Sequence, residues 1–277
     1  MTKYIKYEIK GTYKVILGII AVVLIISTVL YNYMDKGKTS FMLGSFMLMF
    51  GAFLITFLYI VNSFKKELYE DRGYLTFTLP LTGKQIVGAK MIVALMWFIL
   101  LGIIGTLYIF FMIMKMTKPG VVLGEVVMEF SSLNSIGYLR QILIMFISKF
   151  IIWIMTLTLV YFSMTLSRVT FRSRKIGGMW FIIFLVLNII VGYIGVKIVQ
   201  VFPYYLDLTT FKLVNQSIVE RYLEFSSFEY MSFNSSSMIM SGGGKSFINT
   251  TSTIYMIIIT IFAFLSTGYI LENKVDL

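Results

Sequence analysis

Residues 91–114 read MIVALMWFILLGIIGTLYIFFMIM, a run that contains no charged side chain. A helix needs about 20 apolar residues to cross the hydrocarbon core of a bilayer, so this run is long enough to span a membrane. Five other apolar runs of similar length occur along the chain. The six spans predicted from these runs lie near residues 15–34, 41–63, 84–114, 141–166, 177–200 and 252–271.

The composition of the whole chain agrees with this interpretation. Hydrophobic residues make up 58% of the chain and charged residues only 13%, and the mean hydropathy is +0.87. A soluble domain carries about 25% charged residues. We therefore predict an all-α integral membrane protein with six transmembrane helices, forming a single transmembrane domain over residues 1–277.

Several kinds of catalytic site are excluded by the residues that the chain lacks. It contains no histidine and no cysteine, which removes imidazole and thiolate metal ligands and the commonest general base near neutral pH. We expect no catalytic, cofactor-binding or metal-binding residue.

Residues 241–246, SGGGKS, are similar to part of a phosphate-binding loop, but Ile239 stands where that motif needs its first glycine. We interpret this segment as a flexible tip and the chain as lacking an ATPase motif.

Basic residues indicate the orientation in the membrane. More than half of the 24 lysines and arginines, Lys90 among them, fall in the N-terminal segment and in the connections after the second and fourth spans. Cytoplasmic segments are enriched in these residues, so both termini are predicted to be cytoplasmic. The net charge of +11 is therefore interpreted as topological, and no nucleic-acid partner is expected.

The N-terminal segment, residues 1–13, has a helical pattern of its own. At about 100° per residue, Lys3, Lys6, Lys10 and the following Lys14 fall within one narrow arc and Ile5 and Ile9 lie roughly opposite. This pattern is typical of an amphipathic helix that lies on the inner leaflet. The alternative is a frayed basic tail.

The connection between the last two spans, residues 201–251, is long and polar, and we predict that it is an extracellular loop. Long loops of this kind are often functional.

All 13 acidic residues fall in connections, termini or span margins. Because ion-coupled transporters usually place carboxylates within their spans, this distribution disfavours a proton or sodium antiporter.

The cytoplasmic connection 64–83 has the most distinctive local pattern. Residues 64–72 are expected to form a short charged helix with Phe64 and Leu68 on one face, and Gly73 suits the left-handed position that ends it. Thr82 and Gln85 match a capping box at the start of the third span. We interpret this connection as a docking surface for a cytoplasmic protein; the alternative is an ordinary linker.

Residues 70–90, EDRGYLTFTLPLTGKQIVGAK, resemble the stretch after the second span of ABC-2 type permeases, the membrane subunits of many bacterial ABC exporters. The pattern of the whole chain is similar to theirs: an interfacial N-terminal helix, six spans and this connection. The resemblance implies that the connection contains a coupling helix that inserts into a separate ATPase subunit. The basic loop 168–175 would make the second contact. The residues that the resemblance implies for coupling are Phe64, Glu67, Leu68, Tyr69, Glu70, Asp71, Arg72, Gly73, Tyr74, Phe77, Arg168 and Arg172.

The resemblance also implies partners and a location. Two cytoplasmic ATPase subunits would bind ATP and Mg²⁺, and a second permease subunit, identical or different, would complete the transporter in the bacterial cell membrane. A narrower similarity is to exporters of cytolytic peptides of the phenol-soluble modulin type and to lantibiotic self-protection systems. The long 201–251 connection differs from the compact re-entrant segment of many members, so the outer gate of the family is not transferred to this chain.

Two polar residues within the predicted spans are candidates for the translocation path. Lys149 lies about 13 Å into the fourth apolar run, and either faces a cavity or extends to the outer interface. Asn188, in the fifth run, is expected to form an interhelical hydrogen bond rather than to bind substrate. Gly102 with Gly105, and Gly192 with Gly195, are small residues that would allow close approach of two helices.

The leading hypothesis is therefore a permease subunit of an ABC exporter that moves amphipathic, antimicrobial or cytolytic peptides, or lipophilic drugs. A stand-alone channel or membrane immunity protein without an ATPase partner is the alternative. An intramembrane enzyme is less favoured, because the spans contain no carboxylate pair and no histidine.

Overall fold

The computed structural model describes residues 1–33, 38–69, 81–116, 135–170, 178–208, 210–219, 239–240 and 246–274. Six helices in these residues are long and apolar enough to cross a membrane, which agrees with the predicted number of spans. The helices are α1 (Thr2–Tyr33), α2 (Lys38–Tyr69), α4 (Gly83–Met116), α6 (Ser135–Thr170), α7 (Met179–Val201) and α9 (Thr250–Asn273).

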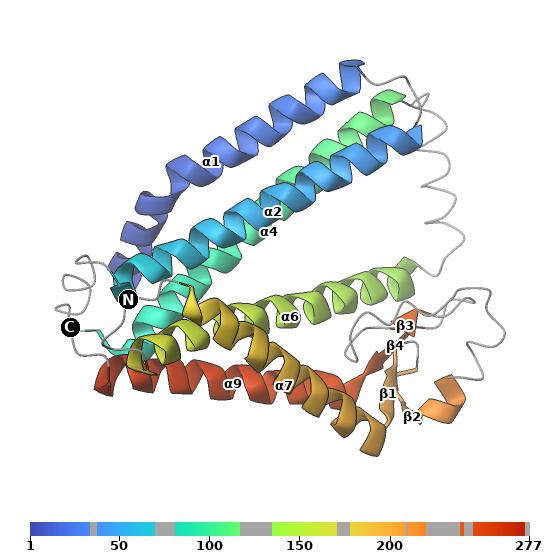
Figure 1. The fold of residues 1–277 in the computed structure, drawn as a ribbon. Helices are drawn as coiled ribbons and strands as arrows, with labels where there is room; N and C mark the ends of the chain where they lie inside the picture. The colour runs from blue at the N-terminus through green and yellow to red at the C-terminus, as the bar shows by residue number, and fades with distance from the viewer. Residues whose placement is uncertain are drawn as a thin grey trace. The chain divides into compact units, whose positions relative to one another are not determined.

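The chain divides into two compact units with three of these helices each (Figure 1). Residues 1–129 form unit 1, with α1, α2 and α4, and residues 130–275 form unit 2, with α6, α7 and α9. The prediction of one transmembrane domain does not anticipate this division. Within each unit every helix contacts the other two, so each unit is a three-helix bundle with its own packing.

The predicted N-terminal helix differs in the structure. Residues 2–33 form one continuous helix instead of an interfacial helix followed by a span. Figure 1 shows its first turns bending away from the axis of the remainder. The Thr12 hydroxyl donates to the Glu8 carbonyl oxygen at 2.8 Å and to the Ile9 carbonyl oxygen at 3.3 Å; hydroxyls bonded back to the preceding turn often bend helices.

One expected feature of this N-terminal segment is confirmed. Its three lysines and the following Lys14 are all exposed, as an amphipathic helix requires. The opposite side carries Tyr4 and Thr12, which are buried against the rest of unit 1, and continues with buried Ile16 and Ile20. The segment is therefore an integral part of the bundle and is more than a surface helix on the membrane.

The start of α4 is as predicted. The Thr82 amide donates to Gln85 Oε1 at 3.2 Å, and the Gln85 amide donates to Thr82 Oγ1 at 3.3 Å. These reciprocal bonds form a capping box, which satisfies two backbone donors at the first turn of the helix. The capping box therefore explains why α4 begins at Gly83. The residues between Tyr69 and Leu81, which lie outside the described part of the chain, are called the 70–80 connection below.

Glycine allows two helices to approach closely in each unit. A side chain added at Gly105 of α4 would overlap the thioether of Met49 in α2, and one added at Gly195 of α7 would lie 3.1 Å from the Tyr255 ring of α9. Close approach at Gly105 and Gly195 is thus confirmed. Gly102 is looser, with Phe53 at 3.8 Å from an added Cβ, and at Gly192 an added Cβ would meet nothing within 4 Å.

Unit 2 packs mainly through α6, whose buried face includes Leu157, Val160, Tyr161 and Met164. The helix makes its most extensive contacts with α9, where Ala263 and Thr267 are buried. Small side chains at such positions let membrane helices pack closely.

A small antiparallel sheet departs from the all-α prediction. It lies within the long 201–251 connection, and its strand order is β2-β1-β4-β3. The strands are β1 (Tyr204–Asp207), β2 (Leu213–Asn215), β3 (Ile239–Met240) and β4 (Ser246–Asn249). Tyr205, Val219 and Phe247 form its buried cluster, with Val214 packed against them. The protein is therefore a mostly helical membrane protein with a small sheet between α7 and α9.

Candidate functional site

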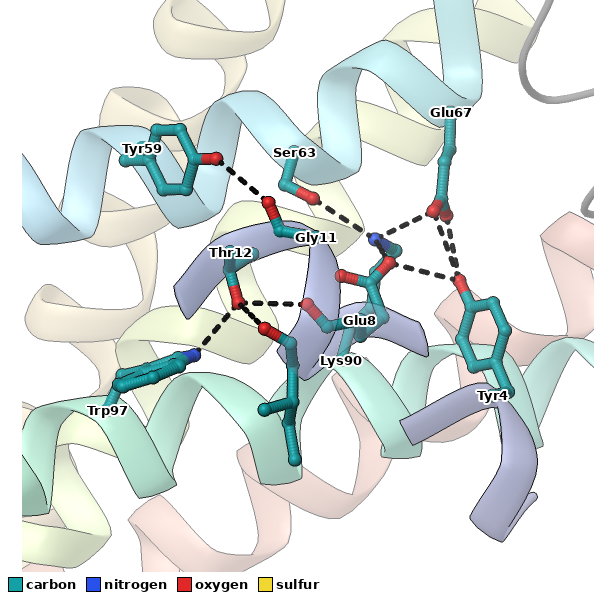
Figure 2. Close-up of polar contacts among 10 residues, drawn as sticks. Tyr4, Glu8, Gly11, Thr12, Tyr59, Ser63, Glu67, Lys90 and Trp97 are labelled. Carbon is teal, nitrogen blue, oxygen red and sulfur yellow. Dashed lines mark hydrogen bonds and ion pairs between the residues drawn. The ribbon is translucent and has the colours of Figure 1, made fainter. Parts of the chain in front are cut away.

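A lysine is buried in unit 1, near the beginning of the largely apolar helix α4. Lys90 lies about two turns into α4, and its side chain is only 3% exposed. Its ammonium contacts Glu8 Oε1 of α1 at 2.5 Å and Glu67 Oε1 of α2 at 2.9 Å. It also donates to Ser63 Oγ at 3.4 Å. One ammonium therefore joins all three helices of the unit, as Figure 2 shows.

Tyr4 completes this cluster from the first turn of α1. Its hydroxyl donates to both carboxylate oxygens of Glu67, at 3.1 and 3.0 Å, and lies 3.5 Å from Glu8 Oε1. Its ring packs on Ile86 and Ala89 of α4. We call the set Tyr4, Glu8, Glu67 and Lys90 the polar cluster.

A second polar contact lies two turns further along α1. The Trp97 indole of α4 donates to Thr12 Oγ1 at 2.9 Å, and this bond is buried. On the other side of α1, the Tyr59 hydroxyl of α2 lies 3.5 Å from the Gly11 carbonyl oxygen. Figure 2 shows α1 held between α2 and α4 by these contacts.

Helical spacing explains how each element supplies its part. Tyr4, Glu8 and Thr12 recur every four residues and so line one face of α1. Ser63 and Glu67 have the same spacing on α2. These positions belong to the beginning of α1, the end of α2 and the beginning of α4. The polar cluster therefore forms at one end of the bundle. At this end α2 stops before the 70–80 connection, and α4 starts after it.

The energetics favour a fixed arrangement of these three helix ends. A charge without a partner in a low-dielectric site is costly, and removing one partner of a buried ion pair costs about 3 to 5 kcal/mol. Each carboxylate of the polar cluster is within hydrogen-bonding distance of the Lys90 ammonium. A movement of α1 away from α2 and α4 would break the Lys90–Glu8 and Tyr4–Glu67 contacts, and a movement of α2 away from α4 would break the Lys90–Glu67 contact. The polar cluster therefore opposes the separation of any two of these helix ends.

The structure assigns the predicted coupling residues on α2 to the interior of unit 1. Phe64 and Leu68 are each 1% exposed, and Glu67 belongs to the polar cluster. Residues 64–69 continue α2 without a break, instead of forming a separate short helix. Tyr69 is the last residue of α2 and is half-buried. The other predicted residues of this connection lie outside the described part of the chain: Glu70, Asp71, Arg72, Gly73, Tyr74 and Phe77.

The remaining predicted positions fall in unit 2. Arg168 lies in the last turn of α6 and is half-buried, whereas Arg172 is outside the described residues. Lys149 is within α6, but its side chain is not described. The Asn188 amide donates to the Phe184 carbonyl oxygen at 3.1 Å. This bond lies within α7 itself, unlike the expected interhelical bond.

Sequence reasoning did not find the polar cluster, although one signal was present. Glu8 lies opposite the lysines of residues 1–13, on the side that was expected to be apolar. The orientation argument places Lys90 in a cytoplasmic connection, whereas the residue is buried within α4. Because the cluster removes one base and two acids from the surface, the excess of basic residues on that side persists.

Comparison of the chain with family models, curated proteins and solved structures gives no match.

Proposed function

We propose that the chain is the membrane-spanning permease subunit of an ABC exporter that moves amphipathic, antimicrobial or cytolytic peptides, or lipophilic drugs. ATP and Mg²⁺ are bound by two separate cytoplasmic subunits, and a second permease chain completes the transport unit. Both termini are cytoplasmic. The six apolar helices and the sequence of residues 70–90 are the basis of this assignment.

The polar cluster is the observation that supports the proposal best. A transporter that is driven by a partner needs a rigid support for the segment that receives the force. Glu67 lies three residues before the 70–80 connection. Lys90 lies after this connection, about two turns into α4. Glu8 binds Lys90 of α4 and Tyr4 binds Glu67 of α2, so both helices are bonded to α1. A displacement of the connection by the ATPase subunit would therefore move the three helix ends together.

The burial of Phe64 and Leu68 reduces the number of residues that can contact the ATPase subunit. Side chains that are 1% exposed pack the bundle and have little surface to offer a partner. We therefore assign partner binding to residues 70–80, with the basic stretch 168–175, which begins in the last turn of α6, as second contact. Residues 64–69 support the contact from within α2.

Co-purification tests the proposal. The tagged chain is extracted from its native membrane in mild detergent, co-eluting proteins are identified, and ATP hydrolysis is measured with and without an amphipathic helical peptide. We expect a stoichiometric nucleotide-binding subunit whose ATP hydrolysis responds to the peptide. An inactive chain that elutes alone would favour the stand-alone channel or immunity protein instead.

Charge reversal in the connection sharpens this test. Glu70→Lys should abolish the peptide response of the ATPase, because it reverses a charge in the proposed contact, while the amount of inserted protein stays unchanged. Glu272→Lys is the matched control, since Glu272 is exposed near the end of α9 and lies on the same predicted side. An equal loss of response in both variants would contradict a specific role of the connection.

A further inference from the structure

The small sheet is attached closely to the ends of two spans. β1 begins at Tyr204, three residues after α7 ends at Val201, and β4 ends at Asn249, which is the N-cap of α9. The Asn249 side chain accepts from the Ser252 amide at 2.8 Å. The Thr251 hydroxyl of α9 donates to the Phe202 carbonyl oxygen at 2.7 Å. The two central strands, β1 and β4, are therefore attached directly to the C-terminal end of α7 and the N-terminal end of α9.

Helix length sets the depth of this attachment. α7 has 23 residues, which corresponds to about 35 Å at 1.5 Å per residue. The hydrocarbon core is about 30 Å thick and the headgroup regions extend the bilayer to about 40–45 Å. The end of α7, and the strand that follows it, therefore lie at the level of the headgroups.

One face of the sheet is largely apolar at this level; Asn215, which pairs with Tyr204, is the exposed polar residue on it. The register places Leu206 opposite Leu213 in β2 and opposite Ile248 in β4, and the alternation along β1 adds Tyr204 to the same face. We call these four residues the outer face. Tyr204 is 51% exposed and Leu213 is 64% exposed. The opposite face carries the buried cluster of Tyr205, Val214 and Phe247.

Residues around the outer face are compatible with a membrane interface. Tyr204 is more than half exposed, and tyrosine and tryptophan are the aromatic residues enriched at headgroup level. Phe202 and Phe211 add exposed apolar rings. Lys197, one turn before the end of α7, has its ammonium 5.8 Å from the centre of the Tyr193 ring. Lysines at this depth extend toward lipid phosphates. The exposed apolar surface of α7 continues into Val201 at the helix end.

We propose that the outer face of the sheet lies in the headgroup region of the bilayer and binds phospholipid. Lipid is favoured over a second protein because four side chains form too small a surface: a stable protein interface buries about 800 Å² on each partner. The sheet then anchors the connection between α7 and α9 to the outer edge of the membrane, whatever the chain transports.

Site-directed spin labelling tests this placement. The chain has no cysteine, so each introduced cysteine is labelled at one site. Leu213→Cys and Tyr204→Cys report the outer face. Ser217→Cys is the matched control, because Ser217 is exposed on the short helical turn 216–219, whose Val219 packs on the opposite face of the sheet. The labelled full-length chain is reconstituted in phosphatidylcholine–phosphatidylglycerol vesicles.

The readout is the accessibility of each label to oxygen, which concentrates in lipid, and to a water-soluble nickel chelate. We expect the ratio of oxygen to nickel accessibility to be several-fold higher at residues 213 and 204 than at residue 217. Equal ratios at the three positions would overturn the proposal, because the outer face would then lie in water. Low accessibility to both reagents at residues 213 and 204 would also overturn it, because protein would then cover that face.

Discussion

The two helix bundles of this protein are held together in different ways. In unit 1, side chains form polar bonds between helices, as in the contacts of Lys90 with Glu8 and Glu67 and of Trp97 with Thr12. In unit 2, the buried threonine hydroxyls of α6 and α9 bond within their own helix. Thr165 of α6 donates to the Phe162 carbonyl oxygen at 2.9 Å, and Thr267 of α9 donates to the Ala263 carbonyl oxygen at 2.6 Å.

The polar bonds of unit 1 select which helix ends meet, whereas the contacts of unit 2 depend mainly on close packing. A hydroxyl that bonds back to its own helix leaves a small, nearly apolar surface, so α6 and α9 associate mainly by close contact. The polar cluster instead requires three particular helix ends to meet, because each charge needs its partner. Unit 1 is therefore expected to be sensitive to single charge-removing substitutions, and unit 2 to respond in smaller steps.

The largest effect is predicted for Lys90→Met. The substitution leaves Glu8 and Glu67 buried without a cationic partner and should lower the free energy of unfolding by about 3 to 5 kcal/mol. The measurement is SDS-induced unfolding in bicelles, followed by the fluorescence of Trp97 with the two tryptophans of unit 2 replaced by phenylalanine. Lys66→Met, which removes an exposed lysine from the same end of α2, should change the stability little.

A rescue variant distinguishes charge from shape. Combining Lys90→Met with Glu8→Gln and Glu67→Gln removes all three charges and keeps the side-chain sizes similar. It should recover most of the lost stability, because replacing a complete buried ion-pair group is often close to neutral. If the triple variant is as unstable as Lys90→Met, the polar cluster does not act through its charges.

An intermediate effect is predicted for Gly105→Ala in unit 1. The added methyl group would overlap the Met49 side chain, and overpacking typically costs about 1 to 3 kcal/mol. Met49→Ala should reverse part of this loss by opening the space. Gly102→Ala is the control, since its Cβ would lie at an ordinary 3.8 Å from Phe53. Equal effects at both glycines would contradict close approach at Gly105.

The smallest effect is predicted for Tyr255→Phe in unit 2. The Tyr255 hydroxyl donates to the Val191 carbonyl oxygen at 2.9 Å and joins α9 to α7. Interhelical hydrogen bonds in membranes contribute about 0.6 kcal/mol on average, so the loss should be about one sixth of that for Lys90→Met. The same SDS titration, followed by Trp180 fluorescence, measures it against Tyr269→Phe at an exposed position. A loss as large as that of Lys90→Met would remove the contrast between the two units.

The sequence predicts those features that depend on local pattern. Apolar run length identifies the six spans, and the Thr82 and Gln85 spacing identifies the start of α4. Pairing between distant residues follows from no local rule. Glu8 and Lys90 are 82 positions apart, and the period of α1 indicates only that Glu8 faces the bundle, without naming its partner.

The sheet was missed for a related reason. Its strands have two to four residues each, too few for a clear alternating pattern. Its two central strands, β1 and β4, are separated by more than thirty residues of the connection. The division into two units was missed because it depends on which helices pack together, and all six spans have similar apolar composition.

The central claim is that residues 70–80, supported by the polar cluster, contact a separate ATPase. The most direct test is Tyr74→Cys in the cysteine-free chain, labelled with a photo-crosslinker in native membranes, with Ser217→Cys as the control on the opposite predicted side. The account predicts that the label at residue 74 cross-links to a nucleotide-binding protein and the label at residue 217 does not. Cross-links from residue 74 only to lipid or to the chain itself would contradict it.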